Sequence, residues 1–493
     1  MKKKRKKMIE LFQHQKEGIE FLKKTPKAIL ADEMGLGKSR QAIMAAREST
    51  KGTAIIICPA SLKINWEREI KMVYPGESVD VLTSGPEREI EKSDWVVVNY
   101  DMLPKYKEQI LVMVATGQLQ AAIVDEAHYI KGKKTIRAQV TLEIVENIER
   151  VYLLTGTPIM NRPIELFNLL KAVKHPISKA RTVYAKRYCG AYLKTVIRRG
   201  GRILRFMDES GATRLPELRE MIKPVFLRRM KKDVLDLPEK IISIRVNDIG
   251  AEWKRAYDTA WERYVDWVAN HPQEGKNIEN ILTAQHLVEL SKLKQVCSQA
   301  KVSQIVEDIQ EAVDQEEKVI IFSQFTESIR MIAEAASQIK YDTGKQDQWG
   351  KPVMKNIGVV TLTGADKMDA RQESVDRFER DPETKVFVLN IKAGGVGLNL
   401  TAGSIVMFAD MDWSPEVHNQ AEDRAHRIGQ EGTVNVYYYV LKDTIEEDIV
   451  DVLGRKKEVI RSVMQGSKLE GIEASMAKEF MERLSSKLGG VIH

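Results

Sequence analysis

Short, continuously apolar runs typical of buried β-strands alternate with helical stretches in two separate regions of this 493-residue chain. In the first region the runs are Thr53–Cys58, Trp95–Tyr100, Ala121–Glu126 and Arg150–Gly156. In the second they are Lys318–Gln324, Lys385–Asn390, Ser404–Asp410 and Val434–Leu441. Because a strand covered on both faces does not alternate in polarity, this pattern predicts parallel sheets between layers of helices. The expected fold class is therefore α/β, with two lobes.

Composition narrows the class of protein. The chain is 43% hydrophobic and 30% charged, and none of its apolar runs approaches the roughly 18 residues of a membrane span. Three distant cysteines, Cys58, Cys189 and Cys297, argue against a disulfide framework or a zinc site and favour a reducing compartment. The net charge of +7 is a weak hint of a polyanionic partner. The basic start, MKKKRKKM, is not a secretory signal; it could steer nucleic acid, address the nucleus or be a solvated tail.

The stretch AILADEMGLGKSRQAI, at residues 28–43, resembles a phosphate-binding loop between a strand and a helix. Its end fits the pattern G-x-x-x-x-G-K-[ST], but Asp32 stands where the first glycine belongs. Glycines allow the tight turn that points backbone N–H groups at phosphate, at a helix N-terminus. Lys38 would then reach the terminal phosphates and Ser39 would bind magnesium. Taken alone, the stretch could also be an ordinary strand–turn–helix.

Two adjacent acids, Asp125 and Glu126, follow the apolar run of AAIVDEAH. Ligands of open α/β sheets bind at the carboxyl ends of the strands, and paired acids there are costly unless they face a cation or water. We expect Asp125 to hold magnesium and Glu126 to orient and polarise the attacking water. For His128, which comes two residues later, we expect a coupling or packing role. The alternative is a helix start capped by acids.

In its motifs the chain resembles the Swi/Snf-type ATPases of helicase superfamily two, over about residues 11–466. The phosphate-loop residues DEMGLGKS, 32–39, match that family's loop, in which aspartate replaces the first glycine. The resemblance also covers PASLKINWEREI, VVNYDML, LLTGTPIMNRPIELFNLL, PVFLRRMKKDVLDLPEK, VIIFSQF, KAGGVGLNLTAGSIVMFADMDWSP and QAEDRAHRIGQ, in the family's order. It implies two RecA-like parallel-sheet lobes with helical insertions and a C-terminal helical brace.

The resemblance also implies roles for single residues. LFQHQKEGIEFL resembles the adenine-recognition segment, which assigns Gln15 to the base. The coupling of hydrolysis to lobe movement falls to Thr155, Gly156 and Thr157. The candidate nucleotide-binding residues are Gln15, Gly35, Leu36, Gly37, Lys38, Ser39 and Gln41, with ATP and magnesium as the implied cofactors.

Arg424 and Arg427 in QAEDRAHRIGQ lie three residues apart, so a helix would place them on one face. Arginine stays charged and presents a fork of donors that suits phosphate oxygens. We expect them to act as arginine fingers on nucleotide held by the first lobe, with Arg427 the better candidate. The alternative is a pair of surface arginines beside Glu422 and Asp423.

DNA is the partner that the resemblance implies. The candidate phosphate contacts are Ser61, Lys63, Ser323, Gln324 and Asn399, because backbone tracking needs small and polar groups rather than base-reading ones. Trp66, Tyr100 and Trp413 could stack on bases, although such aromatics are more often part of a core or cleft wall.

We expect a basic tail at residues 1–10, a first lobe at 11–240 with a helical insertion near 165–225, and a second lobe at 241–443 with an insertion near 250–300. A brace and tail fill 444–493, where Thr444 and Glu447 suggest a capping box. Within the first insertion, Leu193–Phe206 is a candidate basic hairpin that turns at Gly200 and Gly201.

The sequence thus predicts a DNA-stimulated ATPase, a monomeric motor that translocates along double-stranded DNA and remodels DNA structures or protein–DNA complexes. Forked or branched DNA is one possible substrate. Its location would be the cytoplasm of a bacterium or a virus-infected cell, with the nucleus as the alternative. A strand-separating DNA or RNA helicase is one rival function, and a nucleotide-switched DNA clamp with little turnover is another.

Overall fold

The computed structural model describes residues 11–83, 85–132, 135–156, 162–197, 203–209, 211–270, 284–394 and 398–451. The chain forms two compact units, and the boundary between them falls between Asp236 and Leu237. The predicted division into 11–240, 241–443 and 444–493 stays a prediction. Among the described residues, no helix combines the length and the apolar character needed to cross a bilayer.

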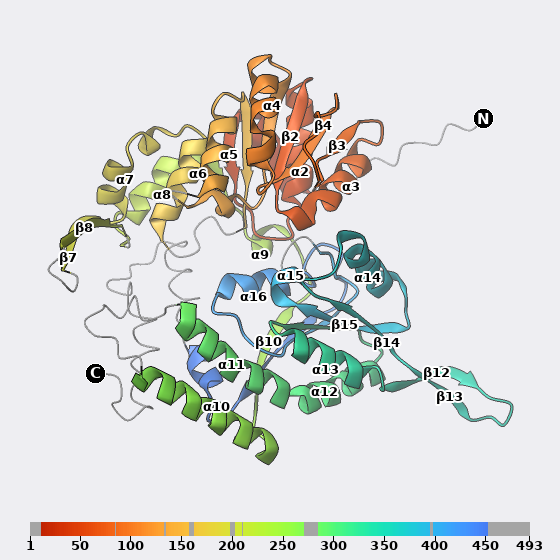
Figure 1. The fold of residues 1–493 in the computed structure, drawn as a ribbon. Helices are drawn as coiled ribbons and strands as arrows, with labels where there is room; N and C mark the ends of the chain where they lie inside the picture. The colour runs from red at the N-terminus through yellow and green to blue at the C-terminus, as the bar shows by residue number, and fades with distance from the viewer. Residues whose placement is uncertain are drawn as a thin grey trace, which may run out of the picture. The chain divides into compact units, whose positions relative to one another are not determined.

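The first unit is built on a sheet of seven parallel strands in the order β3-β4-β2-β5-β6-β1-β9 (Figure 1). The strands are β1 (Lys27–Leu30), β2 (Thr53–Cys58), β3 (Val79–Val81), β4 (Trp95–Asn99), β5 (Leu119–Val124), β6 (Arg150–Leu154) and β9 (Phe226–Leu227). All residues of β2 and β4 are buried, as expected for strands covered on both faces.

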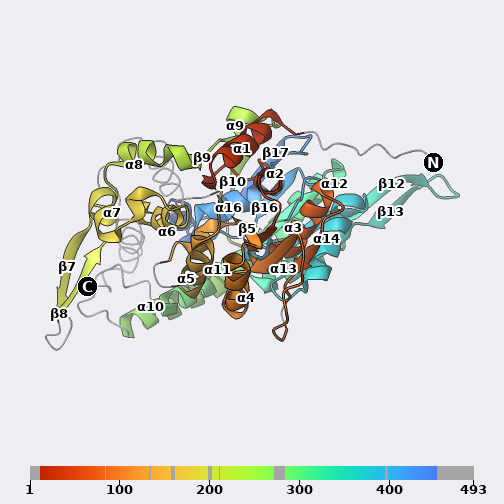
Figure 2. The ribbon, with the colours of Figure 1, turned by 90° about the horizontal axis from the view of Figure 1, so that it is seen from above.

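The helices of the first unit include a layer on each face of its sheet. They are α1 (Gln13–Lys24), α2 (Lys38–Ser49), α3 (Lys63–Val73), α4 (Leu103–Ala115), α5 (Ile136–Glu146), α6 (Leu166–Ala172), α7 (Arg181–Tyr188), α8 (Leu215–Ile222) and α9 (Lys231–Val234). Helices α1, α2 and α3 pack in series, and so do α4, α5 and α6. The crossovers through α2 and α3 run along the sheet in the opposite direction to those through α4 and α5. Right-handed connections therefore place the two sets on opposite faces (Figure 2).

A two-stranded antiparallel hairpin, β7 (Tyr192–Ile197) with β8 (Ile203–Asp208), projects from the first unit. This confirms the hairpin predicted for Leu193–Phe206. Its expected turn at Gly200 and Gly201 lies outside the described residues.

The second unit contains a six-stranded parallel sheet in the order β10-β17-β16-β11-β15-β14. Its strands are β10 (Lys240–Asn247), β11 (Val319–Ser323), β14 (Gly358–Leu362), β15 (Thr384–Asn390), β16 (Ile405–Phe408) and β17 (Val434–Leu441). Along β11, Ile320 and Phe322 join one apolar core while Val319 and Ile321 join the other. Strand β11, in the interior of the sheet, is therefore buried on both faces, as its sequence predicts.

The helices of the second unit are α10 (Ala251–Asn270), α11 (Ala284–Ala300), α12 (Val302–Asp314), α13 (Thr326–Ala336), α14 (Met368–Arg380), α15 (Ile391–Gly394) and α16 (Pro415–Glu422). Helices α13 and α14 pack against the same strands from opposite faces (Figure 1). A second hairpin, β12 (Lys340–Gln346) with β13 (Pro352–Asn356), forms its own sheet.

The first turns of the predicted brace, residues 445–451, pack into the second unit. Glu446 is buried and lies 2.6 Å from the ammonium of Lys301. The capping interactions are displaced by one residue from a capping box. The Thr444 hydroxyl accepts from the amide of Glu446 (3.2 Å), and the Glu447 carboxylate accepts from the amide of Asp443 (3.2 Å).

Candidate nucleotide site

The phosphate loop links β1 to α2, and its turn depends on two glycines. Gly35 (φ 84°) and Gly37 (φ 73°) lie in the left-handed region, which side chains rarely adopt. A Cβ at Gly37 would also come within 2.3 Å of the Gln15 amide nitrogen. Helix α2 begins directly after this glycine, at Lys38, so the N–H groups of its first turn face the loop.

Lys38 lies with its ammonium held inside the loop. Its Nζ donates to the backbone carbonyls of Asp32 (2.8 Å) and Glu33 (3.2 Å). Ser39, one residue further on, is partly exposed. This geometry matches the predicted positions of a phosphate-binding lysine and a metal-binding hydroxyl, whose roles stay predictions.

Asp32, which replaces the usual first glycine, is completely buried and paired with Arg229. The Arg229 Nη2 is 2.5 Å from Asp32 Oδ2, and Arg229 Nε is 3.0 Å from Oδ1. The backbone amide of Arg229 also donates to Oδ1 (3.1 Å). A buried carboxylate is stable only with such charge-assisted partners, and the bidentate fork provides them.

Strand β9 brings Arg229 to the loop. It pairs in parallel with β1 and aligns Leu227 with Leu30, so the chain leaves the sheet beside the phosphate loop. Arg228 follows, and its guanidinium donates to the carbonyls of Ala31 and Gly156, both at 3.1 Å. Neither arginine is among the site residues that the sequence predicts. The available signal was the adjacent pair in PVFLRRM and the need of Asp32 for a cation.

Three side chains converge on the carbonyl oxygen of Leu36. His14 Nε2 lies 3.1 Å from it, and the side-chain amides of Gln15 and Gln41 donate to it at 3.4 and 3.1 Å. All three side chains are buried. The loop is therefore fixed from α1 and from within α2. The binding of adenine or phosphate by Gln15 and Gln41 stays a prediction.

The acid pair lies where β5 ends, at the edge of the sheet that carries the phosphate loop. Asp125 Oδ2 accepts from Trp66 Nε1 (2.9 Å), and Oδ1 accepts from the amide of Glu126 (2.9 Å). Burial, followed by the charge of Glu126, raises the pKa of Asp125 to about 7, against the opposing effect of Lys38. A divalent cation bound to a carboxyl with such a raised pKa would stabilise its charged form.

Glu126 adopts a left-handed backbone conformation (φ 48°), which is strained for a residue with a side chain. Its Oε2 lies 3.2 Å from Nδ1 of His128. This contact supports a positioning role for His128, in line with its predicted coupling or packing role.

The predicted coupling segment adjoins the phosphate loop. The amide of Thr155 donates to the carbonyl of Leu30 (3.2 Å). A Cβ at Gly156 would come within 2.6 Å of the Met34 side chain. Thr157 lies outside the described residues.

The aromatic residues considered for base stacking are buried or partly buried. Trp66 and Tyr100 belong to the core of the first unit, and the Tyr100 hydroxyl donates to the Asp125 carbonyl (2.5 Å). Trp413 packs against a core of the second unit. Their contacts favour the alternative reading, in which they support the site or the core.

The DNA-contact candidates of the first unit are Ser61 and Lys63. Ser61 is partly exposed. Lys63 is buried, and its ammonium donates to the carbonyl of Leu82 (2.7 Å). In this structure Lys63 therefore stabilises the fold, and its contact with phosphate stays a prediction.

In the second unit, Ser323 and Gln324 bind the buried carboxylate of Asp410. The Ser323 hydroxyl donates at 2.5 Å and the Gln324 side-chain amide at 3.0 Å. Asn399 is exposed. Of these three predicted phosphate contacts, Asn399 has the most accessible side chain.

Arg424 and Arg427 do not lie on a helix, so that expectation is wrong. Helix α16 ends at Glu422, and residues 423–427 form a series of turns. The Arg424 carbonyl accepts from the amide of Leu400 (3.1 Å), which fixes the chain to another loop and prevents a continuous helix. Arg424 is buried, and Arg427 is partly exposed. Their roles as arginine fingers stay predictions.

The family model of the SNF2-related domain matches residues 14–302, and that of the helicase conserved C-terminal domain matches residues 300–429. The chain is 30% identical over 472 residues to the human (Homo sapiens) "DNA annealing helicase and endonuclease ZRANB3", covering 94% of this chain and 41% of that protein. It is 30% identical over 488 residues to "Uncharacterized ATP-dependent helicase MG018" of Mycoplasma genitalium, covering 92% and 42%. The chain thus spans about two fifths of the length of these relatives.

Among solved structures, the chain is similar to the "Sulfolobus solfataricus SWI2/SNF2 ATPase core in complex with dsDNA", with a TM-score of 0.41 and 23% identity. That likeness covers 99% of this chain and 97% of the other. The SNF2-related model alone covers more than half of the sequence, including the phosphate loop, the acid pair and Arg229. The chain therefore belongs to the SNF2-related family.

Proposed function

We propose that this protein hydrolyses Mg–ATP in its first unit and uses the energy to translocate along double-stranded DNA. The observation that carries the proposal is the placement of the Lys38 loop and the Asp125–Glu126 pair at one edge of one parallel sheet. Their charges interact, since Lys38 lowers the pKa of Asp125 against the effect of burial. Paired acids facing a phosphate-binding lysine are the arrangement that phosphoryl transfer needs.

The residues present fit Mg–ATP. The glycine turn and the start of α2 offer backbone N–H groups to phosphate, and Lys38 would replace its bonds to loop carbonyls with bonds to the β- and γ-phosphates. Ser39 and Asp125 would hold the metal, which supplies neutralisation of charge on the phosphates. Glu126, positioned by its strained backbone and by His128, would orient the attacking water.

DNA as the substrate is supported by the family and by what the relatives are called. The human relative is named a DNA annealing helicase, and a yeast relative, 27% identical over 537 residues, is a "TATA-binding protein-associated factor MOT1". Because the chain spans only part of these proteins, their partners are not transferred to it. We propose duplex DNA, including forked or branched forms, a monomeric motor, and arginine fingers at Arg424 and Arg427. We also propose a bacterial or virus-infected cytoplasm as the location.

The test is ATP hydrolysis with no nucleic acid and with duplex, single-stranded, forked and four-way DNA and RNA. Stimulation by duplex DNA, together with displacement of a triplex strand without unwinding of the duplex, is the expected result. Duplex unwinding would identify a strand-separating helicase instead. Stimulation by RNA alone would identify an RNA motor, and binding to DNA without turnover would identify a nucleotide-switched clamp.

A further inference from the structure

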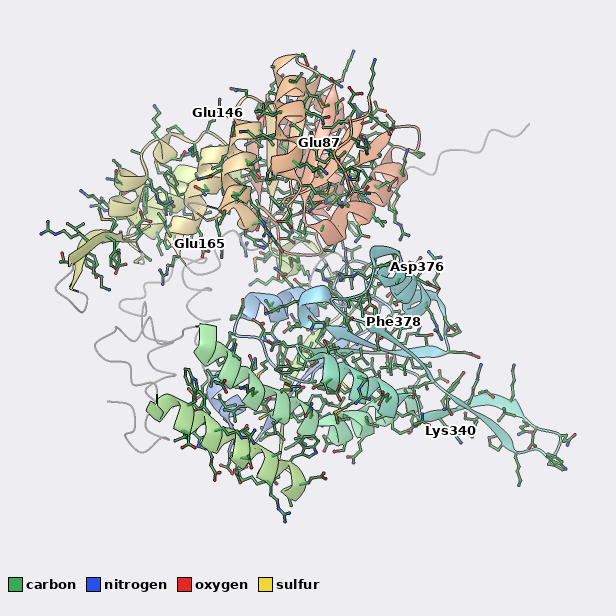
Figure 3. The ribbon with its side chains drawn as sticks, viewed as in Figure 1. Glu87, Glu146, Glu165, Lys340, Asp376 and Phe378 are labelled. Atoms are coloured by element: carbon green, nitrogen blue, oxygen red, sulfur yellow. The ribbon has the colours of Figure 1, made fainter. Side chains whose placement is uncertain are left out.

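The β12–β13 hairpin is an arm that projects from the second unit (Figures 1 and 2). It connects α13 to β14 and joins neither of the large sheets. Its base is fixed: the amide of Ile357 donates to the Ile339 carbonyl (3.0 Å), and Tyr341 packs against the core. Lys340 marks this base in Figure 3. Beyond it, the residues of β13 are all exposed.

The turn at the end of the arm is held by Asp347. Its Oδ1 accepts from the amides of Trp349 (2.8 Å) and Lys351 (2.9 Å), and its carbonyl accepts from the amide of Gly350 (3.0 Å). Gly350 has φ 77°, the left-handed conformation that lets the chain reverse. These bonds give the turn one defined shape, so the side chain between them is presented in a fixed place.

That side chain is Trp349, which is 75% exposed, more than any other large apolar residue that the structure describes. Leaving an indole in water forgoes the largest burial gain that any side chain offers. A fold that holds tryptophan at the bonded turn of a projecting arm therefore presents a surface for contact with another molecule.

The charges around Trp349 indicate what that molecule is. Residues 340–356 contain four lysines and two aspartates, so the arm carries a net charge of +2. Lys345 and Lys351, which flank the turn, are exposed and form no ion pair with any residue that the structure describes. Asp342 and Asp347 accept bonds from the backbone of the arm itself. A molecule that complements this arm is a polyanion with exposed aromatic rings.

We propose that the β12–β13 arm binds single-stranded DNA next to a duplex, with Trp349 stacked on an unpaired base and Lys345 and Lys351 at the flanking phosphates. Stacking on tryptophan accepts any base, and lysines follow the backbone without reading sequence. An intact duplex hides its base faces, so the arm would bind only where strands are separated. This inference rests on the proposed action on DNA. It adds a preference for forks and for other sites where single-stranded DNA adjoins a duplex.

The experiment compares the binding of a blunt duplex and of a forked duplex with the same paired region, by fluorescence anisotropy with the full chain. Trp349→Ala should weaken binding of the fork about 10-fold and leave binding of the blunt duplex unchanged. Trp349→Phe keeps an aromatic face and should retain most of the preference. Met354→Ala removes an exposed apolar side chain of β13, away from the turn, and should have no effect.

Two further readouts identify the contact. Photocrosslinking of forked DNA with iodouracil in its single-stranded part should label the peptide that contains Trp349. Lys345→Gln with Lys351→Gln should reduce the salt dependence of fork binding but not that of duplex binding. Equal binding of the fork by the wild type and Trp349→Ala would overturn the proposal, even where duplex DNA still stimulates ATP hydrolysis. A wild type that binds no DNA would overturn both this inference and the proposed function. Capture of a protein in place of DNA by the arm would also overturn it.

Discussion

Arg229 binds both carboxylate oxygens of Asp32, and the two residues are separated by 197 positions in the sequence. Asp32 is not among the residues with positive φ, so its place in the loop does not require a glycine. Its backbone carbonyl accepts from Lys38 while its side chain accepts from Arg229 and, at 3.5 Å, from Gln41. The aspartate therefore ties the phosphate loop to β9, which a glycine could not do.

Arg229→Ala should destabilise the first unit by about 3–5 kcal/mol, because it leaves the buried charge of Asp32 without its partner. The measurement is hydrogen exchange at the amides of β1, β9 and α2, which should become faster. Asp32→Asn combined with Arg229→Gln keeps a neutral hydrogen-bonded pair. The double variant should therefore lose much less stability than the sum of the losses in the two single variants. Additive losses would show that the two side chains do not act as a pair.

Lys38→Ala should reduce ATP hydrolysis at least about 100-fold, because the ammonium that stabilises charge on the phosphates is lost. DNA affinity without nucleotide should stay close to that of the wild type. Lys51→Ala, at an exposed lysine just beyond α2, is the control and should hydrolyse ATP normally. Full activity in Lys38→Ala would exclude this loop as the phosphate site.

Binding of Mg–ADP should release a proton below pH 7. The pKa of Asp125 is raised to about 7, so its carboxyl is largely protonated in the free protein below that pH and must ionise to bind the metal. Release should approach about one proton per site as the pH falls below 7 and should disappear well above pH 7. The affinity for Mg–ADP should weaken as the pH falls. Calorimetry in buffers of different ionisation enthalpy measures this.

Asp125→Asn supplies the baseline for that measurement, because it keeps the size of the side chain and removes its proton. Proton release that is the same in the variant and the wild type would assign it to the nucleotide. The pKa assignment, and with it the metal-binding role of Asp125, would then be wrong.

Arg427→Ala should slow turnover by about 1,000-fold with a much smaller change in ATP affinity, as expected for a group that acts on charge developing during hydrolysis. Single-turnover kinetics and equilibrium binding of a labelled nucleotide separate the two effects. Arg330→Ala, at an exposed arginine of α13 paired with Glu327 and Glu334, is the matched control. An effect of Arg427→Ala on affinity alone would argue against the finger.

Much of the sheet architecture could be predicted because buried parallel strands carry a local signal. β2 and β17 have the predicted bounds, and the other six predicted runs overlap β4, β5, β6, β11, β15 and β16, with bounds that differ by at most two residues at each end. Strands β3, β9, β10 and β14 and the β12–β13 hairpin were not predicted. Residues of β10 such as Ile241 and Val246 are exposed, and the hairpin depends on turn bonds at Asp347 rather than on apolar periodicity.

The sequence by itself determined the phosphate loop, the acid pair and the family, because each depends on residue types at fixed, short spacings. Only the tertiary structure decided which cation neutralises Asp32, that Lys63 is buried, and that α16 stops before Arg424. These outcomes depend on strand order and on bonds between distant segments, such as the pairing of β9 with β1 and the bond between Leu400 and Arg424. A buried charge is neutralised by whichever partner the fold brings near it, and the spacing of neighbouring residues in the sequence does not identify that partner.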